Sequence, residues 1–180
     1  INEIKKNFKN FDDDVLSSER LDIIYGLAGN SPFLEKLMIK QSNFLYLLLK
    51  KGPTKLKEYF FEELEKKINK TNDLKELKST FRIAKSQLSL MVGAADVSRE
   101  WTLGEVTETL SLFADLALKA GSAYLLFEQM GGGNLKWPNG KRQKFSLNIG
   151  SSSGFFVLAL GKLGGRELNY SSAVDLIILY

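Results

Sequence analysis

Two residue types that often carry chemistry are missing from this sequence, which has no cysteine and no histidine among its 180 residues. Without cysteine there is no disulfide framework and no thiolate metal site. Without histidine there is no catalytic triad, no imidazole general base and no ordinary zinc site. Any metal chemistry must therefore use oxygen ligands, which favours magnesium or manganese.

Long apolar runs and targeting signals are missing as well. No segment approaches eighteen consecutive apolar residues, so the sequence predicts no membrane span. The sequence begins at Ile1 rather than at a methionine, and no signal-peptide pattern lies near this end. We therefore expect a cytoplasmic protein, and a sequence that is a fragment of it.

The positive charge of the chain is spread rather than concentrated. The net charge is +4, and much of the excess is lysine scattered among glutamates between residues 50 and 70. This mixture is typical of a solvated helical surface. Because aromatic residues do not alternate with these charges, the sequence predicts no nucleic-acid partner.

The first part of the sequence, residues 1–130, is predicted to be a helical region. Ser31 followed by Pro32 is typical of a helix start, because serine caps the exposed amides and proline suits the first helical position. Gly52 and Pro53 are expected to end one helix and open the next.

Two long amphipathic helices are expected in the second half of this region. Asn72 is expected to cap the first, and Thr102 and Glu105 fit a capping box that opens the second. Each helix presents one apolar stripe, because the apolar positions recur at alternating spacings of four and three, so the two should pack antiparallel. The first stripe is Leu77, Phe81, Ala84, Leu88, Met91 and Ala95, and the second is Val106, Leu110, Phe113, Ala117, Ala120, Tyr124 and Phe127.

The pattern changes after residue 130. Residues 131–154 are rich in glycine, serine and basic residues, which predicts a loop with a short strand or hairpin around Phe145–Ile149. Phe155–Leu160 is then an apolar run of strand length. Val174–Tyr180 is typical of a second, buried strand. A glycine-rich turn, a short helical turn and a polar loop lie between them.

The order of these strands and turns excludes two common phosphate-binding motifs and favours a third. The sequence has no G-x-x-x-x-G-K-[ST] motif, which excludes a P-loop, and no G-x-G-x-x-G after the first strand, which excludes a dinucleotide fingerprint. A strand, a Gly-Gly turn and a second strand with an acid at its start resemble the nucleotidyltransferase superfamily of the DNA polymerase β type. In that pattern, backbone amides approach phosphate oxygens at the glycines. Two aspartates in an Asp-x-Asp pair point to the same side of the strand and hold metal ions with a third acid.

The resemblance extends to one family. Residues 157–177 are similar to the G-K-L-G-G-x-E-L-N-x-S-S-D-x-D-L-I signature of the glutamine synthetase adenylyltransferase family. The helices from residue 75 onward are also similar to those before the first catalytic domain of the family. Residues 155–180 would then be the incomplete beginning of a nucleotidyltransferase domain. The fold class implied is α+β, mostly α, with an antiparallel helical bundle followed by the truncated start of a mixed sheet.

The resemblance implies an enzyme with two nucleotidyltransferase halves. The N-terminal half, to which we expect this chain to belong, would remove AMP from a tyrosine of glutamine synthetase by phosphorolysis and form ADP. The C-terminal half would add AMP from ATP, and PII signalling proteins would regulate the balance. The expected cofactor is Mg²⁺ or Mn²⁺, and the expected partners are glutamine synthetase and PII.

The site residues follow from the same signature. Gly161, Gly164 and Gly165 are expected to form the phosphate turn. Ser171 and Ser172 are expected to shape the loop that enters the metal strand, and Asp175 is expected to be the metal ligand. Lys162 and Arg166 are either phosphate neighbours or ordinary surface cations of the turn.

Position 173 departs from the signature, because Ala173 stands where the family has its first aspartate. Asp175 is then the one acid on the metal face of this strand, and the sequence predicts an inactive polypeptide from an enzymatic family. Two alternatives remain open. In the first, the chain is a non-catalytic interaction module derived from a nucleotidyltransferase. In the second, it belongs to another enzyme of the superfamily with a different substrate.

Overall fold

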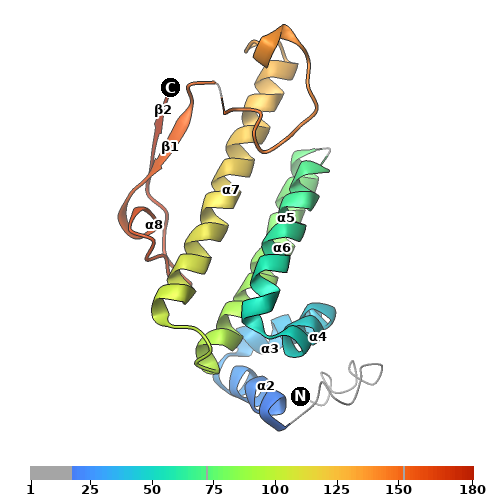
Figure 1. Cartoon of the computed structure of the whole chain (residues 1–180), viewed down its shortest axis with the longest axis vertical. Helices are drawn as coiled ribbons and strands as arrows, with labels where there is room; N and C mark the ends of the chain where they lie inside the picture. The colour runs from blue at the N-terminus through green and yellow to red at the C-terminus, as the bar shows by residue number, and fades with distance from the viewer. Residues whose placement is uncertain (1–17, 72, 152) are drawn as a thin grey trace. The chain divides into compact units, whose positions relative to one another are not determined.

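The computed structural model describes residues 18–71, 73–151 and 153–180 (Figure 1). The chain forms two compact units, each built from two stretches of sequence. The first unit contains the described residues up to Glu62 together with Arg82–Val106. The second contains Glu63–Phe81 and Thr107–Tyr180 and includes the glycine-rich turn. The structure is mostly helical with a small sheet, which confirms the predicted α+β, mostly α class.

In its described residues the first unit consists of helices and short connections, and local signals set where its helices begin. Ser31 caps a helix by accepting a hydrogen bond from the Leu34 amide at 3.2 Å, with Pro32 at the first helical position, as predicted. Gly52, with φ of 74°, ends one helix before Pro53 opens the next, also as predicted. The helices of this unit are α2 (Ser18–Asn30), α3 (Pro32–Lys40), α4 (Ser42–Lys51) and parts of α5 (Pro53–Asn69) and α6 (Leu74–Val97).

The start of α5 is held by the residues that follow α6. The Glu100 carboxylate accepts hydrogen bonds from the amide of Thr54 at 3.3 Å and from its hydroxyl at 2.7 Å. The buried indole of Trp101 donates to the same hydroxyl at 2.9 Å. A negative charge at the positive end of the α5 dipole stabilises the helix.

The predicted stripe of α6 is confirmed. Five of its six members are buried, and Phe81 is half-buried. The predicted cap, Asn72, lies outside the described residues. The neighbouring Asp73 accepts a hydrogen bond from the Glu76 amide at 2.8 Å, which makes its carboxylate the cap observed here.

Helix α7 (Leu103–Gly131) opens with the predicted capping box. The amide of Thr102 donates to the Glu105 carboxylate at 2.7 Å, and the amide of Glu105 donates back to the Thr102 hydroxyl at 3.3 Å. The Thr102 hydroxyl also donates to the Glu105 carboxylate at 2.9 Å, and the two bonds donated by the amide and the hydroxyl of Thr102 lower the pKa of Glu105, because they favour the charged carboxylate. All members of the predicted α7 stripe are buried or half-buried. Phe81 of α6 packs edge-on against Phe113, with ring centroids 5.8 Å apart.

By length and composition, α7 is the one helix in the described part of the chain that is apolar enough to cross a membrane. Core helices of water-soluble proteins have the same length and composition. On this helix Thr109 and Ser111 are buried, and Asp115 forms an ion pair with Arg166.

The predicted strand or hairpin around Phe145–Ile149 is wrong. This segment forms turns, in which the Ile149 amide donates to the Ser146 carbonyl at 3.1 Å and the Leu147 amide donates to the Asn69 side chain at 3.1 Å. The Phe145 ring packs against Phe127, with centroids 5.7 Å apart. Leu147 and Ile149 are therefore buried, and their amides are satisfied without a partner strand.

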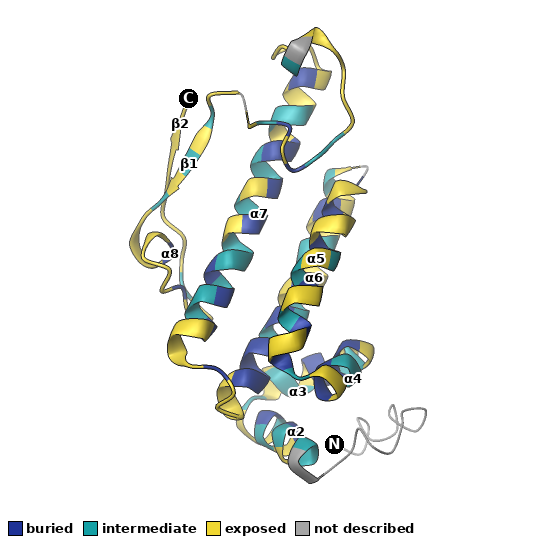
Figure 2. Ribbon diagram, in the orientation of Figure 1, coloured by how far each residue is buried: buried dark blue, intermediate teal, exposed yellow. Residues whose placement is uncertain are grey.

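Two short strands form an antiparallel ribbon that lies along α7 (Figure 1). Strand β1 (Phe156–Ala159) and strand β2 (Leu176–Leu179) pair with Phe156 opposite Leu179 and Ala159 opposite Leu176. Both strands were predicted, but the predicted burial of the second is wrong, because every residue of β2 is exposed (Figure 2). Within the described residues β2 pairs with β1 alone.

Candidate functional site

The glycine-rich turn begins where β1 ends. Gly161 has φ of 55°, in the region that favours glycine, and starts the single-turn helix α8 (Gly161–Gly164). The amide of Gly164 donates to the Leu160 carbonyl at 3.2 Å, and the amide of Gly165 donates to the Gly161 carbonyl at 3.0 Å. Two of the three predicted phosphate-turn amides are therefore used within the turn itself. The amide of Gly161 lies at the open N-terminal end of α8, where helical amides have no partner within the helix.

Gly164 allows the turn to fold tightly onto β1. A β-carbon at this position would lie 2.5 Å from the Ala159 carbonyl oxygen, closer than real β-carbons come to other atoms. A β-carbon on Gly165 would meet the Gly161 carbonyl oxygen at 3.6 Å, an ordinary contact. Glycine at 164 is therefore a steric requirement of the fold, independent of any ligand.

The predicted metal ligand lies beside this turn. The Leu160 amide donates to the Asp175 carbonyl at 2.9 Å, which extends the pairing of β1 and β2 by one step. The Asp175 side chain is exposed and does not point into the apolar core. Its Oδ2 atom lies 3.5 Å from the point where a β-carbon on Gly161 would be. The structure thus brings together Gly161 and the Asp175 carboxylate.

The loop before β2 is closed by its own polar side chains. The Ser172 hydroxyl donates to Asn169 Oδ1 at 2.6 Å and accepts from the Asn169 amide at 3.1 Å. The amide of Ser171 donates to the same Asn169 oxygen at 3.2 Å. The two serines, predicted to shape the entry to the metal strand, lie in a compact turn that leads to Ala173 and Asp175.

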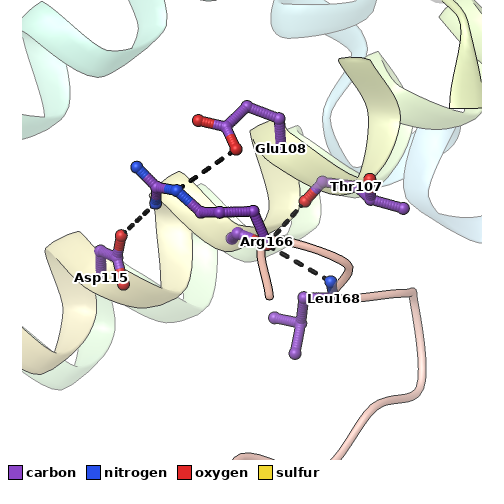
Figure 3. Close-up of polar contacts among 6 residues, drawn as sticks. Thr107, Glu108, Asp115, Arg166 and Leu168 are labelled. Atoms are coloured by element: carbon purple, nitrogen blue, oxygen red, sulfur yellow. Dashed lines mark hydrogen bonds and ion pairs between the residues drawn. The ribbon is translucent and has the colours of Figure 1, made fainter. Parts of the chain in front are cut away.

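Arg166 contacts carboxylates of α7. Its Nε atom lies 3.3 Å from Glu108 Oε2, and its Nη1 atom forms a close ion pair with Asp115 Oδ2 (Figure 3). Its backbone has φ of 60°, which is uncommon for a residue with a side chain. A phosphate would have to compete with both carboxylates for this guanidinium. Lys162, the other predicted phosphate neighbour, is exposed on α8.

A buried hydroxyl lies between these two ion pairs along the helix. The Ser111 hydroxyl donates to the Thr107 carbonyl at 2.8 Å and accepts from the Leu168 amide at 3.3 Å. Leu163 and Leu168, on either side of Arg166, are both buried. The contacts of Glu108, Ser111 and Asp115 with Arg166 and Leu168 form a seam that was not predicted from the sequence. Its signal is a polar stripe on a mostly apolar helix, formed by Glu108, Ser111 and Asp115 at spacings of three and four.

The acids present supply only part of a metal site. Among the residues that the structure describes, no three carboxylates come together in a way that would hold an ion. Asp175 offers one exposed carboxylate beside the turn, and position 173 offers only a methyl group. Magnesium in phosphate-handling sites is usually held by one or two carboxylates plus the phosphates of the substrate. The residues present therefore do not fit a two-ion centre.

A cavity of about 300 Å³ lies near the seam, between α7 and β1. Leu118, Ala123 and Leu126 of the helix and Val157 of the strand make its wall largely apolar, and Asp115 lies at its edge. None of the predicted phosphate or metal residues lines it, so the cavity is separate from the pair formed by Gly161 and Asp175.

Comparisons with known proteins identify relatives over most of the chain. A family model described as glutamate-ammonia ligase adenylyltransferase matches residues 21–180. Proteins named bifunctional glutamine synthetase adenylyltransferase/adenylyl-removing enzyme are similar to it. The one from Agrobacterium fabrum is 39% identical over 58% of this chain, and the one from Bradyrhizobium diazoefficiens is 30% identical over 88%. A third, from Rhodopseudomonas palustris, is 28% identical over 87%. The matched segments cover only 10% to 15% of the length of these three relatives.

Proposed function

Because the chain belongs to the glutamate-ammonia ligase adenylyltransferase family, we propose that it is part of a bifunctional enzyme that adds adenylyl groups to glutamine synthetase and removes them. The chain therefore belongs to a family of nucleotidyltransferases. We assign it to the N-terminal, adenylyl-removing half. Its reaction is phosphorolysis, in which a phosphate oxygen attacks the AMP phosphorus, the bond to the tyrosyl oxygen breaks, and that oxygen takes a proton. The products are ADP and unmodified glutamine synthetase.

The observation that carries this proposal is the position of the Asp175 carboxylate beside Gly161. The Gly161 backbone, which carries no side chain, and the exposed Asp175 carboxylate lie next to each other at this point. Phosphate oxygens approach the backbone at Gly161, and the ammonium group of Lys162 supplies positive charge on the same turn. Asp175 would be the single carboxylate available to hold Mg²⁺ or Mn²⁺, and the ion would neutralise phosphate charge when bound.

Ala173 makes the chain inactive as it stands. An aspartate there would lie two residues before Asp175 and would supply the second carboxylate of the pair. Losing one ligand from a phosphoryl-transfer site removes several kcal/mol of transition-state stabilisation, about a thousandfold in rate. The remaining assignments are part of the same proposal and rest on the resemblance of residues 157–177 to the family signature. Glutamine synthetase is the substrate, PII is the regulator, ATP serves the other half of the full-length enzyme, and the protein is cytoplasmic.

The test is a chimera of the full-length Bradyrhizobium diazoefficiens relative, in which the aligned segment is replaced by the matching 159 residues of this chain. One version keeps Ala173 and the other carries Ala173→Asp. Both are supplied with adenylylated glutamine synthetase, Mg²⁺ and inorganic phosphate, and ADP is measured. We expect phosphate-dependent ADP only with the aspartate. Equal activity of the two versions would refute the role given to position 173.

The second candidate, a non-catalytic interaction module, is favoured by one observation, the alanine itself. It predicts that this chain binds glutamine synthetase or PII with the same affinity whether residue 173 is alanine or aspartate, and that neither chimera forms ADP. Calorimetric titration of both purified partners, alongside the ADP assay, separates the two functions.

A further inference from the structure

We infer that Arg166 is a positioning residue that acts through Glu108 and Asp115, rather than a contact of the substrate phosphate. The inference rests on the proposed function. It assigns a role to two acids of α7 that no part of the family signature contains. Arg166, Glu108, Asp115 and Ser111 are called the α7 clamp below.

The geometry of the contacts points to this role. Glu108 and Asp115 lie seven residues apart on α7, about two turns, so they lie on the same face of the helix. The guanidinium of Arg166 bridges them, with one nitrogen on each carboxylate (Figure 3). A guanidinium presents several donors in a fixed fork, so it can hold two acids at a defined spacing, as a lysine cannot.

The clamp continues into the backbone. Ser111, midway between the two acids, is fully buried and accepts the Leu168 amide two residues after Arg166. The buried side chain of Leu163 anchors the chain three residues before Arg166. The segment from α8 to Leu168 is thus attached to α7 by a hydrogen bond and ion pairs, and its two leucines are buried.

The loop that carries position 173 has one end at this clamp and the other at the sheet. It leaves α7 after Leu168 and reaches the ladder at Asp175, whose carbonyl accepts the Leu160 amide. Fixing both ends of a short loop limits the conformations that it can adopt. The clamp therefore sets where Gly161, position 173 and the Asp175 carboxylate lie relative to one another.

The two roles of Arg166 predict opposite effects for the same carboxylate change. If Arg166 positions the turn, then Arg166→Gln and the double variant Glu108→Gln/Asp115→Asn cause the same defect. If Arg166 binds phosphate directly, then removing the two carboxylates frees its charge and strengthens phosphate binding. Combining all three substitutions adds little in the first case, because the groups act as one unit.

The first measurement is hydrogen exchange on the otherwise unchanged chain. Both variants are expected to speed exchange at the Gly165 and Leu168 amides about threefold to tenfold, which corresponds to losing partly exposed ion pairs. Glu128→Gln, which removes an acid from the same helix outside the clamp, serves as the control and leaves these amides unchanged. Unchanged exchange at Leu168 in either clamp variant would overturn the inference. If Arg166→Gln unfolds the chain, Arg166→Lys is expected to give the same local change in milder form.

The second measurement is binding of ADP with Mn²⁺ in the Ala173→Asp background, followed by calorimetry. A positioning role predicts that Arg166→Gln and the double carboxylate variant both weaken ADP binding about threefold or more. Weaker binding in the first with tighter binding in the second would make Arg166 a phosphate ligand and overturn the inference. If Ala173→Asp itself binds no ADP, the proposed function fails, and the exchange measurement alone decides the clamp.

Discussion

Gly164 packs against Ala159 so closely that a β-carbon on the glycine would lie 2.5 Å from the Ala159 carbonyl oxygen. This contact fixes the angle at which α8 leaves β1. The glycine is thus required by the shape of the turn, even though its own amide is bonded to Leu160. A glycine in a motif can be required for the shape of the turn or for phosphate binding. At position 164 the two requirements can be tested separately.

Gly164→Ala is expected to destabilise the turn by about 1–3 kcal/mol, because a backbone oxygen cannot move aside as a side chain can. Hydrogen exchange at the Arg166 and Glu167 amides, which bond back into the turn, measures the effect. Gly165→Ala is the matched control, because its new β-carbon would meet only an ordinary contact at 3.6 Å. Equal losses in the two variants would show that crowding at Ala159 is not the cause.

Gly121→Ala is expected to stabilise the protein. Gly121 lies in the interior of α7, and no atom lies within 4 Å of the point that a β-carbon would occupy, so alanine adds helix propensity without a clash. The expected gain in the free energy of unfolding is about 0.5–1 kcal/mol, measured by urea denaturation. Gly93→Ala in α6 is the comparison. Its β-carbon would lie 3.1 Å from a Leu34 methyl carbon, so it should gain less or lose stability.

Ala173→Asp is expected to create a cation site where Asp175 alone binds weakly. A second carboxylate two residues before Asp175 should raise the affinity for Mn²⁺ about tenfold or more, since affinity for hard cations rises with the number of charged ligands. Electron paramagnetic resonance of free Mn²⁺ gives the dissociation constant. The double variant Ala173→Asp/Asp175→Asn should bind no better than the unchanged chain, and strong binding there would mean that the ion lies elsewhere.

The capping box predicts a specific loss of stability in acid. The pKa of Glu105 is lowered in the folded protein by its bonds from Thr102. A group with a lowered folded pKa stabilises the protein above its unfolded pKa, and this contribution disappears as the pH falls through the folded pKa. Glu105→Gln should therefore reduce the fall in stability below about pH 5 and lower stability at pH 7. Thermal unfolding from pH 3 to pH 7 measures both effects, and Thr102→Ser, which retains the hydroxyl, should behave like the unchanged chain.

Local signals in the sequence predicted the helices well. The caps at Ser31 and Thr102 and the stripe of α6 depend on residues within a few turns of each other, and the structure confirms them. The strand around Phe145–Ile149 failed for the opposite reason. Its apolar residues resemble a strand, but the amide of Leu147 is satisfied by Asn69, 78 residues away in the sequence. The burial of β2 failed because exposure depends on neighbours that a strand pattern does not reveal.

The candidate site was predictable only in part. The signature brought Gly161 and Asp175 into one hypothesis, and the structure has them adjacent. It did not reveal the clamp, because Arg166 meets Asp115 across 51 positions of sequence. A single sequence does not show which loop packs against which face of α7. The roles of the glycines, the serines and Asp175 in binding phosphate and metal remain predictions for the experiments above.

The exposed setting of Ala173 has an evolutionary consequence. Its methyl group stands in solvent, so an aspartate at this point would displace no packed neighbour and bury no charge. Two of the four alanine codons become aspartate codons by a single nucleotide change. From either of them, one point mutation would restore the carboxylate here, and nothing in the described structure requires a compensating change elsewhere.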